Sequence, residues 1–112
     1  MSKKTKPDHL KHLRQSTREW YDSTVEDWEL APHHLRVLQL AAESWDRCQE
    51  AREILAKDGL CVTNRFGERK QHPMVAVERD ARTAFCRCIR ELGLDLIDSP
   101  VDPRLPRLGG GQ

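Results

Sequence analysis

Long apolar stretches are missing from this sequence. No apolar run approaches the roughly 18 residues of a membrane-spanning helix, and the basic start lacks the apolar segment of a signal peptide. We therefore expect a protein of the cytoplasm. With 112 residues, of which 38% are apolar and 33% charged, the chain has material for one domain with a small core. A core of that size favours oligomerisation.

Motifs of catalysis and metal binding are missing as well. The sequence has neither the phosphate-cradling G-x-x-x-x-G-K-[ST] nor a nucleophile elbow. Its four cysteines lack the C-x₂-C pairs of a zinc site, and Cys86 and Cys88 point to different faces of a helix. The histidine pairs have no acidic or cysteine partner at ligand spacing. The expectation is a protein that is not an enzyme and that needs neither a metal nor a cofactor.

Charge, by contrast, is plentiful and unevenly distributed. Residues 1–18 carry six basic residues and one acidic residue, a net charge of +5, and residues 19–58 carry ten acidic and four basic residues, a net charge of −6. Basic arms with few apolar residues usually stay disordered and often bind polyanions, although a solubilising tail has the same composition. We predict a disordered basic arm over residues 1–15.

Helical signals fill most of residues 16–98, the predicted domain. The segment 16–19, Ser-Thr-Arg-Glu, has the spacing of a capping box, so a short first helix is expected from there to about Trp28. Pro32 suits the first position of a second helix, and Gly59 suits a left-handed end to it. The resulting helix over residues 32–58 would be about 40 Å long.

The second and third helices differ in how their apolar residues are spread. Apolar side chains cover more than half of the 32–58 helix, far beyond the ~100° stripe that one packing neighbour requires. We infer several neighbours, and hence a homo-oligomer larger than a dimer. The antiparallel third helix, from Pro73 to Gly93, has one apolar and one arginine-rich side. The predicted subunit contacts are Leu38, Trp45, Cys48, Arg52, Leu55, Phe85, Cys88 and Ile89, with Arg52 as an ion-pair donor between subunits.

A small β-hairpin at residues 60–71 is expected to join the two long helices. Its turn, residues 64–67, places Gly67 where a positive φ is needed. Because an isolated hairpin is marginal in water, it must contact a helix or another subunit. Prolines in residues 99–112 exclude a helix there and predict an extended Pro/Arg tail, which is either a disordered end or a linear docking motif.

Three cationic sets are candidates for nucleic-acid contacts. The arginines of the third helix are natural partners of the acidic second helix, so we assign them to ion pairs with residues such as Glu43 and Glu50. The arm and the hairpin remain free for phosphate. The predicted DNA-binding residues are Lys3, Lys4, Lys6, Lys11, Arg14, Arg65, Arg69 and Lys70.

A helix-turn-helix interpretation, with the 32–58 helix in the major groove of DNA, is also open. The acidic residues of that helix argue against it, because phosphate would repel them. A dimeric transcription regulator stays the alternative to a higher-order assembly. An acidic helical scaffold without nucleic acid is a third possibility.

Four fragments lie in an order and spacing that carry a family resemblance. They are Lys57-Asp58-Gly59-Leu60, the hairpin 62–67, Gln71-His72-Pro73, and Glu91-Leu92-Gly93-Leu94 before the tail. Over roughly residues 20–104 the chain resembles phage terminase small subunits of a branch with Gly-Leu, glycine-hairpin, His-Pro and Leu-Gly-Leu signatures. The resemblance implies a non-enzymatic packaging component of the bacterial host cytoplasm. Such a component forms a ring, binds double-stranded viral DNA and passes it to the large subunit, which carries the ATPase and nuclease.

Overall fold

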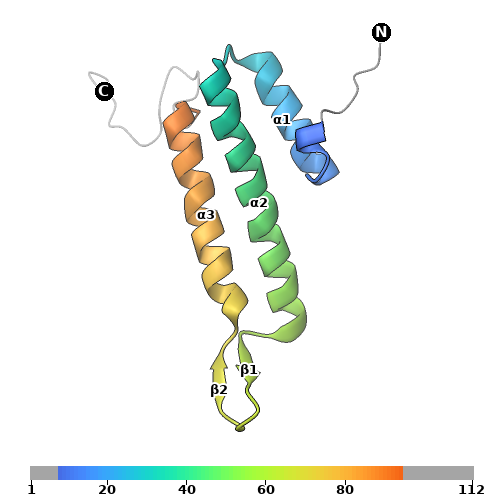
Figure 1. The fold of residues 1–112 in the computed structure, drawn as a ribbon, viewed down its shortest axis with the longest axis vertical. Helices are drawn as coiled ribbons and strands as arrows, with labels where there is room; N and C mark the ends of the chain where they lie inside the picture. The colour runs from blue at the N-terminus through green and yellow to red at the C-terminus, as the bar shows by residue number, and fades with distance from the viewer. Residues whose placement is uncertain (1–7, 95–112) are drawn as a thin grey trace, which may run out of the picture.

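The computed structural model describes residues 8–94 (Figure 1). A single 3₁₀ turn, η1 (Asp8–Leu10), precedes helices α1 (Gln15–Asp27) and α2 (Pro32–Asp58). Strands β1 (Cys61–Thr63) and β2 (Arg69–Gln71) follow, and helix α3 (Pro73–Leu92) returns along α2. The predicted mostly helical fold with a hairpin between two long helices is confirmed. None of the helices in the described range has the length and apolar content to cross a membrane.

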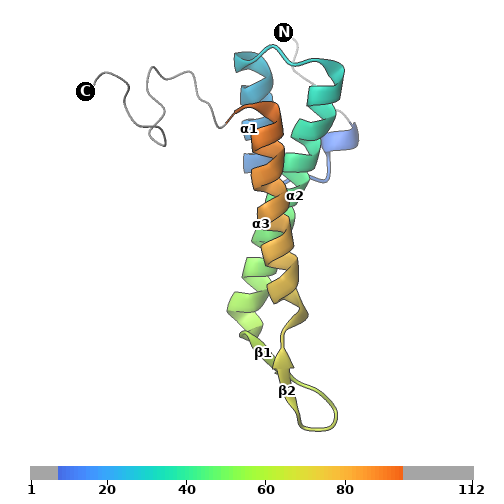
Figure 2. The same ribbon diagram turned by 90° about the vertical axis from the view of Figure 1, so that its left-hand side faces the viewer.

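Helices α2 and α3 form an antiparallel pair that lies side by side in Figure 1, and in the turned view of Figure 2 α3 lies in front of α2. The buried residues along this pair are small ones, Ala41, Cys48 and Ala51 on α2 and Ala81 on α3. Small side chains let two helix backbones approach closely, which explains a long contact that contains few large buried residues. Figure 1 shows α1 along the half of α2 that is remote from the hairpin.

The end of α2 differs from the prediction in one detail. Gly59 has the expected positive φ of 88°, but its ψ of 171° lies outside the left-handed helical region. Its N–H still donates to the Leu55 carbonyl at 2.7 Å, so the last helical turn is closed. Because ψ at Gly59 is extended, the chain continues directly into β1 and does not turn back along α2 at this residue.

The hairpin has the predicted position and a defined register. Val62 faces Lys70 and Thr63 faces Arg69 across the two strands. Gly67 has φ of 82°, as its place in the turn requires. At the base, buried His72 caps α3 by accepting a hydrogen bond from the Met74 amide at Nδ1 (3.1 Å), while its Nε2 lies 2.9 Å from a carboxylate oxygen of Asp58. The histidine thereby ties the hairpin base to the ends of both long helices.

The packed unit begins earlier than the boundary predicted at residue 15. Leu10 and Leu13 are each only 3% exposed, and they share a core cluster with Tyr21, Leu38 and Ala42. These two leucines cover α2 beside α1, so the segment from Asp8 to residue 14 belongs to the folded unit. Two leucines among many charged residues were too weak a signal for the sequence to reveal this. Residues 1–7 of the predicted arm lie outside the described range, as do residues 95–112 with the predicted tail.

The predicted capping box at the start of α1 is wrong. The helix begins at Gln15, two residues too early for Ser16 to cap it, and the side chain of Arg14, its N-cap residue, makes no capping bond. Asp46 of α2 takes the part of the carboxylate in such a box: it accepts from the amide of the N-cap residue Arg14 at 2.8 Å and also from the Thr17 hydroxyl at 2.5 Å. A cap supplied from another helix leaves no local sequence pattern.

The face of α1 that packs also differs from the expectation. The apolar residues Trp20, Val25 and Trp28 are the ones that hydrophobicity alone would bury, whereas the buried residues of α1 are Thr17, Tyr21 and Thr24. These three follow the i, i+4, i+7 spacing of one helix face. Thr24 satisfies its hydroxyl by donating to the Trp20 carbonyl at 2.9 Å, so burial leaves no unpaired donor. Val25 and Trp28 are thereby left exposed, whereas Trp20 is half-buried against the core cluster.

Candidate functional site

The cationic hairpin is the clearest candidate for contact with a polyanion. Arg65, Arg69 and Lys70 are all exposed on it, and none of them forms an ion pair with another residue of the described range. Side chains alternate between the faces of a strand, so Arg69 and Lys70 point to opposite faces of the hairpin. The hairpin thus carries cations on both sides.

The predicted contacts in the arm are less available than those of the hairpin. Arg14 makes a two-pronged ion pair with Glu53, with distances of 2.8 and 2.9 Å. This hydrogen bonding raises the pKa of the Arg14 guanidinium and lowers the pKa of the Glu53 carboxyl. Lys11 lies 3.1 Å from Asp8, with both side chains well exposed. Arg14 is therefore a bridge between the start of α1 and α2. The positions of Lys3, Lys4 and Lys6 lie outside the described residues.

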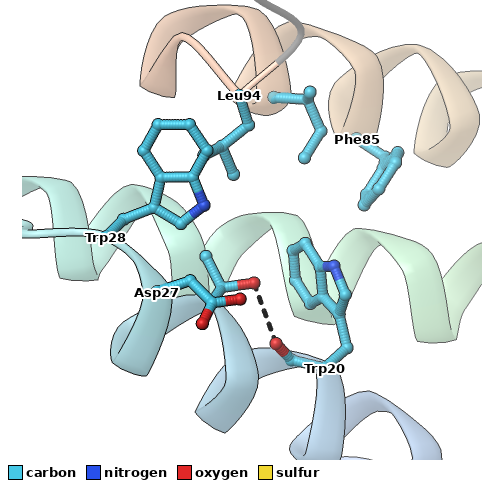
Figure 3. A pocket seen from close by; sticks show the side chains of 7 residues that line it. Trp20, Asp27, Trp28, Phe85 and Leu94 are labelled. Carbon is cyan, nitrogen blue, oxygen red and sulfur yellow. Dashed lines mark hydrogen bonds between the residues drawn. The ribbon is translucent and has the colours of Figure 1, made fainter. Parts of the chain in front are cut away.

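An aromatic groove runs between α1 and α3 (Figure 3). In it the Phe85 ring centroid lies 6.0 Å from that of Trp20 and 5.2 Å from that of Trp45. Figure 3 shows Trp28 and Leu94 at the end of the groove where α3 stops. Two adjoining hollows of about 720 Å³ and 330 Å³ share Trp20 and Phe85. Their lining residues are Ser16, Thr17, Trp20, Thr24, Asp27, Trp28, Trp45, Phe85, Ile89 and Leu94.

The residues predicted to make subunit contacts differ in their exposure and in whether they line this groove. Trp45 is 41% exposed, and Phe85 and Ile89 are half-buried along the groove. Leu38 and Cys48, in contrast, are 0% and 2% exposed within one chain, so the expectation that they lack cover in a single subunit is wrong. They are covered because the N-terminal leucines and α3 lie over them. Leu55 and Cys88 are half-buried, outside the residues that line the groove.

Arg52, predicted to pair between subunits, pairs within the chain. Its guanidinium Nε lies 3.1 Å from Glu78 on α3, and the same carboxylate accepts two hydrogen bonds from Arg82 at 3.2 Å. The Cys48 thiol also lies 3.5 Å from it. Hydrogen bonding from Arg82, with further bonds from Arg52 and Cys48, lowers the pKa of Glu78 to about 2. Burial raises the pKa of the Cys48 thiol, which keeps it protonated as a donor.

The assignment of the α3 arginines to Glu43 and Glu50 is also wrong within one chain. Glu43 accepts from Gln39 at 2.9 Å and lies 2.9 Å from His12, and Glu50 lies 3.3 Å from Arg47. The recorded partners of both carboxylates thus come from α2 itself and from His12, and none of them is an α3 arginine. The α3 arginines at 79, 82, 87 and 90 are all exposed.

The structure also bears on the helix-turn-helix interpretation. Helix α2 packs on α3 along one side and on α1 and the N-terminal leucines along another. Its remaining surface mixes the acidic residues Glu50 and Glu53 with the basic residues Arg36 and Arg47 and with exposed Leu40. A recognition helix needs a free, preferably cationic face that can lie in the major groove. Helix α2 offers no such face.

Sequence reasoning missed seven of the ten residues that line the groove, among them Trp20, Thr24, Trp28 and Leu94. Trp20, Thr24 and Trp28 recur at steps of four along α1, which places them on one side of that helix. This spacing was a usable signal for a surface stripe. That Leu94 and Phe85 complete the groove depends on how α1 is seated against α3, which no local pattern encodes.

The described residues thus form three helices with an aromatic groove between α1 and α3 and a cationic hairpin between α2 and α3. Residues 18–98 match the family described as phage terminase, small subunit. The match covers well over half of the chain, and the protein belongs to this family of phage DNA-packaging proteins. Neither a curated protein nor a solved structure matches the chain.

Proposed function

We propose that this small terminase subunit is a non-enzymatic, oligomeric adaptor that binds double-stranded viral DNA and delivers it to the large terminase subunit in the host cytoplasm. Membership of the family carries the proposal. The unpaired cations of the hairpin support the DNA contact, and the uncovered groove between α1 and α3 supports assembly. A ring of subunits turns individually weak phosphate contacts into useful avidity.

Three features of the described surface favour this adaptor over a dimeric regulator. The acidic face of α2 repels phosphate, the hairpin cations are free, and the aromatic groove is too apolar to stay exposed in a monomer without cost. An exposed Trp45 in contact with Phe85 is typical of residues that dominate subunit interfaces. We accordingly place self-association at the groove and DNA at the hairpin.

A salt titration of DNA affinity tests the proposal. Binding to a duplex is measured by fluorescence anisotropy from low to moderate salt for the wild type and for the double variant Arg69→Ala/Lys70→Ala. Each lost phosphate contact should flatten the slope of log K against log salt by about 0.9, so the double variant should bind more weakly with a slope flatter by about two units per engaged subunit. Native mass measurement on the same samples should show an assembly larger than a dimer in both.

The matched control removes the same charge from α3. The variant Arg79→Ala/Arg87→Ala is expected to keep the wild-type salt slope. If the α3 variant flattens the slope and the hairpin variant does not, the DNA contact lies on α3 and the assignment to the hairpin fails. If the wild type does not bind duplex DNA at low salt, the proposed function itself fails.

The contribution of the N-terminal arm needs a shorter deletion than the sequence alone indicated. Removal of residues 1–14 would delete Leu10 and Leu13 from the core together with the Arg14 bridge. Removal of residues 1–7 takes away only Lys3, Lys4 and Lys6 among the predicted contacts. This shorter deletion should lower DNA affinity without changing the number of subunits in the assembly.

A further inference from the structure

The hairpin carries one feature that phosphate contact does not explain, a large apolar side chain at its tip. Phe66 is 74% exposed, more than any other large apolar residue in the described range. The contact recorded for its ring is the Arg65 guanidinium, 5.0 Å from the ring centroid. An aromatic ring held this far from the core contributes little to folding. Its exposure points to a binding role.

We propose that Phe66 is an apolar wedge that enters the minor groove of duplex DNA and partly unstacks a base step, while Arg69 and Lys70 hold the flanking phosphates. The inference rests on the proposed function, because it requires that the hairpin contact DNA. Apolar wedges flanked by cations are a recurrent way in which proteins open and kink the minor groove.

The tip is rigid enough to present the ring in a fixed direction. The Asn64 side-chain oxygen accepts from the amides of Phe66 (2.8 Å) and Glu68 (3.0 Å), and the Asn64 carbonyl accepts from the Gly67 amide at 3.0 Å. Asn64 thus supports the turn from both its side chain and its backbone. Because the turn is formed before binding, insertion of the ring costs little conformational entropy.

The charges on the hairpin are placed to flank a groove that the tip enters. Arg69 lies on the face of the hairpin that Thr63 shares, and Lys70 lies on the opposite face with Val62. A hairpin approaching tip first therefore turns one cation toward each of the two phosphate backbones. Arg65, stacked on the ring in the free protein, is long enough to exchange that contact for a phosphate beside the tip.

Charge also selects DNA over a second copy of the chain as the partner of the tip. Residues 57–71 hold four basic side chains (positions 57, 65, 69 and 70) and two acidic ones (positions 58 and 68), a net charge of +2. Glu68 is engaged by the Asn64 amide at 3.1 Å, and Asp58 by His72. Two hairpins meeting tip to tip would bring like charges together, whereas a polyanion is attracted.

The test measures unwinding of DNA, because this does not require knowledge of the viral recognition site. A relaxed closed plasmid is incubated with the full-length protein and a type I topoisomerase, and its linking number is read after the protein is removed. Unstacked steps are untwisted, so the wild type should leave the plasmid with a changed linking number. Phe66→Ala should abolish this change and bind duplex DNA about tenfold more weakly, with the salt slope unchanged because every cation remains.

Two further variants separate the wedge from a general effect on the fold. Phe66→Leu keeps an apolar tip and should retain the linking-number change. Leu40→Ala removes an exposed apolar side chain from α2 and should behave as the wild type in both measurements. The helical content of all variants, measured by circular dichroism, should be unaltered, since Phe66 packs on no core residue.

Three results would overturn the inference. Wild-type binding without any linking-number change excludes unstacking, and an unchanged signal from Phe66→Ala assigns unstacking to another residue. A smaller assembly for Phe66→Ala in sedimentation would place the ring in a subunit contact. These outcomes leave the proposed function standing, whereas absence of DNA binding by the wild type at low salt defeats the proposed function as well.

Discussion

Among single substitutions of polar residues in the described range, replacement of Asp46 should destabilise the packing of α1 on α2 the most. Its carboxylate is 9% exposed and serves two donors at once, the Arg14 amide at 2.8 Å and the Thr17 hydroxyl at 2.5 Å. The first donor lies at the start of α1 and the second in its first turn. Asp46 therefore provides both the cap of α1 and its polar link to α2.

The expected cost of Asp46→Ala follows from the groups left without a partner. An unsatisfied buried donor costs about 1–3 kcal/mol, and the Thr17 hydroxyl is 3% exposed. Loss of a helix cap costs about 0.5–2 kcal/mol. Allowing for water entering the space of the carboxylate, we expect about 3 kcal/mol in total. In a domain of this size that lowers Tm by roughly 15 °C.

The assay is thermal unfolding followed by circular dichroism, at one fixed protein concentration because assembly makes Tm depend on concentration. Asp80→Ala is the control, since Asp80 is an exposed carboxylate in the middle of α3, and it should shift stability by less than about 0.5 kcal/mol. Asp46→Asn keeps one acceptor oxygen and should fall between the two. Thr17→Val should cost about 1 kcal/mol less in the Asp46→Ala background than in the wild type. A Tm for Asp46→Ala equal to that of the control would refute the cap.

Three further outcomes are expected. Trp45→Asp should convert the assembly to smaller species in native mass measurement, and the opposite result, loss of assembly with Leu40→Asp alone, would move the interface to the other side of α2. Gly67→Val should lower the free energy of unfolding by about 1 kcal/mol or more, because its φ of 82° strains any side chain even though the space beside it is open; an unchanged Tm would show that the turn relaxes. The depressed pKa of Glu78, about 2, stabilises the fold at pH values above the unfolded-state pKa of about 4.3, and this contribution is lost as pH falls toward 2. Glu78→Gln should therefore remove part of the acid-induced fall in Tm, and an acid profile identical to the wild type would contradict the ion cluster.

The sequence predicted the long helices and the hairpin because their boundaries are marked locally. Pro32 and Pro73 open helices, and Gly59, Gly67 and Gly93 supply the three positive φ angles of the described chain. Such residues act through their own backbone preferences, which do not depend on distant partners. Helix and turn boundaries that depend on such residues can therefore be predicted from the sequence.

Contacts between distant segments were predicted less well. The cap of α1 comes from Asp46, which accepts a hydrogen bond from the Arg14 amide and lies 32 residues further along the chain. The pairing of Arg14 with Glu53 spans 39 residues. A charge pattern shows that such partners exist on both segments, but which acid meets which base depends on the seating of η1 and α1 on α2. The sequence therefore did not show that Lys11 and Arg14 of the arm form ion pairs, whereas the cations of the hairpin form none in the described range.

The two candidate surfaces, the hairpin and the aromatic groove, lie far apart along α3. The hairpin precedes α3 and the end of the groove at Leu94 follows it, and 20 helical residues place about 30 Å between them. Sites that far apart affect one another's folding energy little. In the proposed function they are nevertheless coupled through assembly, since a groove that holds subunits together would set how many hairpins act on one DNA molecule. A groove variant should therefore weaken DNA binding by reducing the number of contacts, whereas a hairpin variant weakens each contact and leaves their number unchanged.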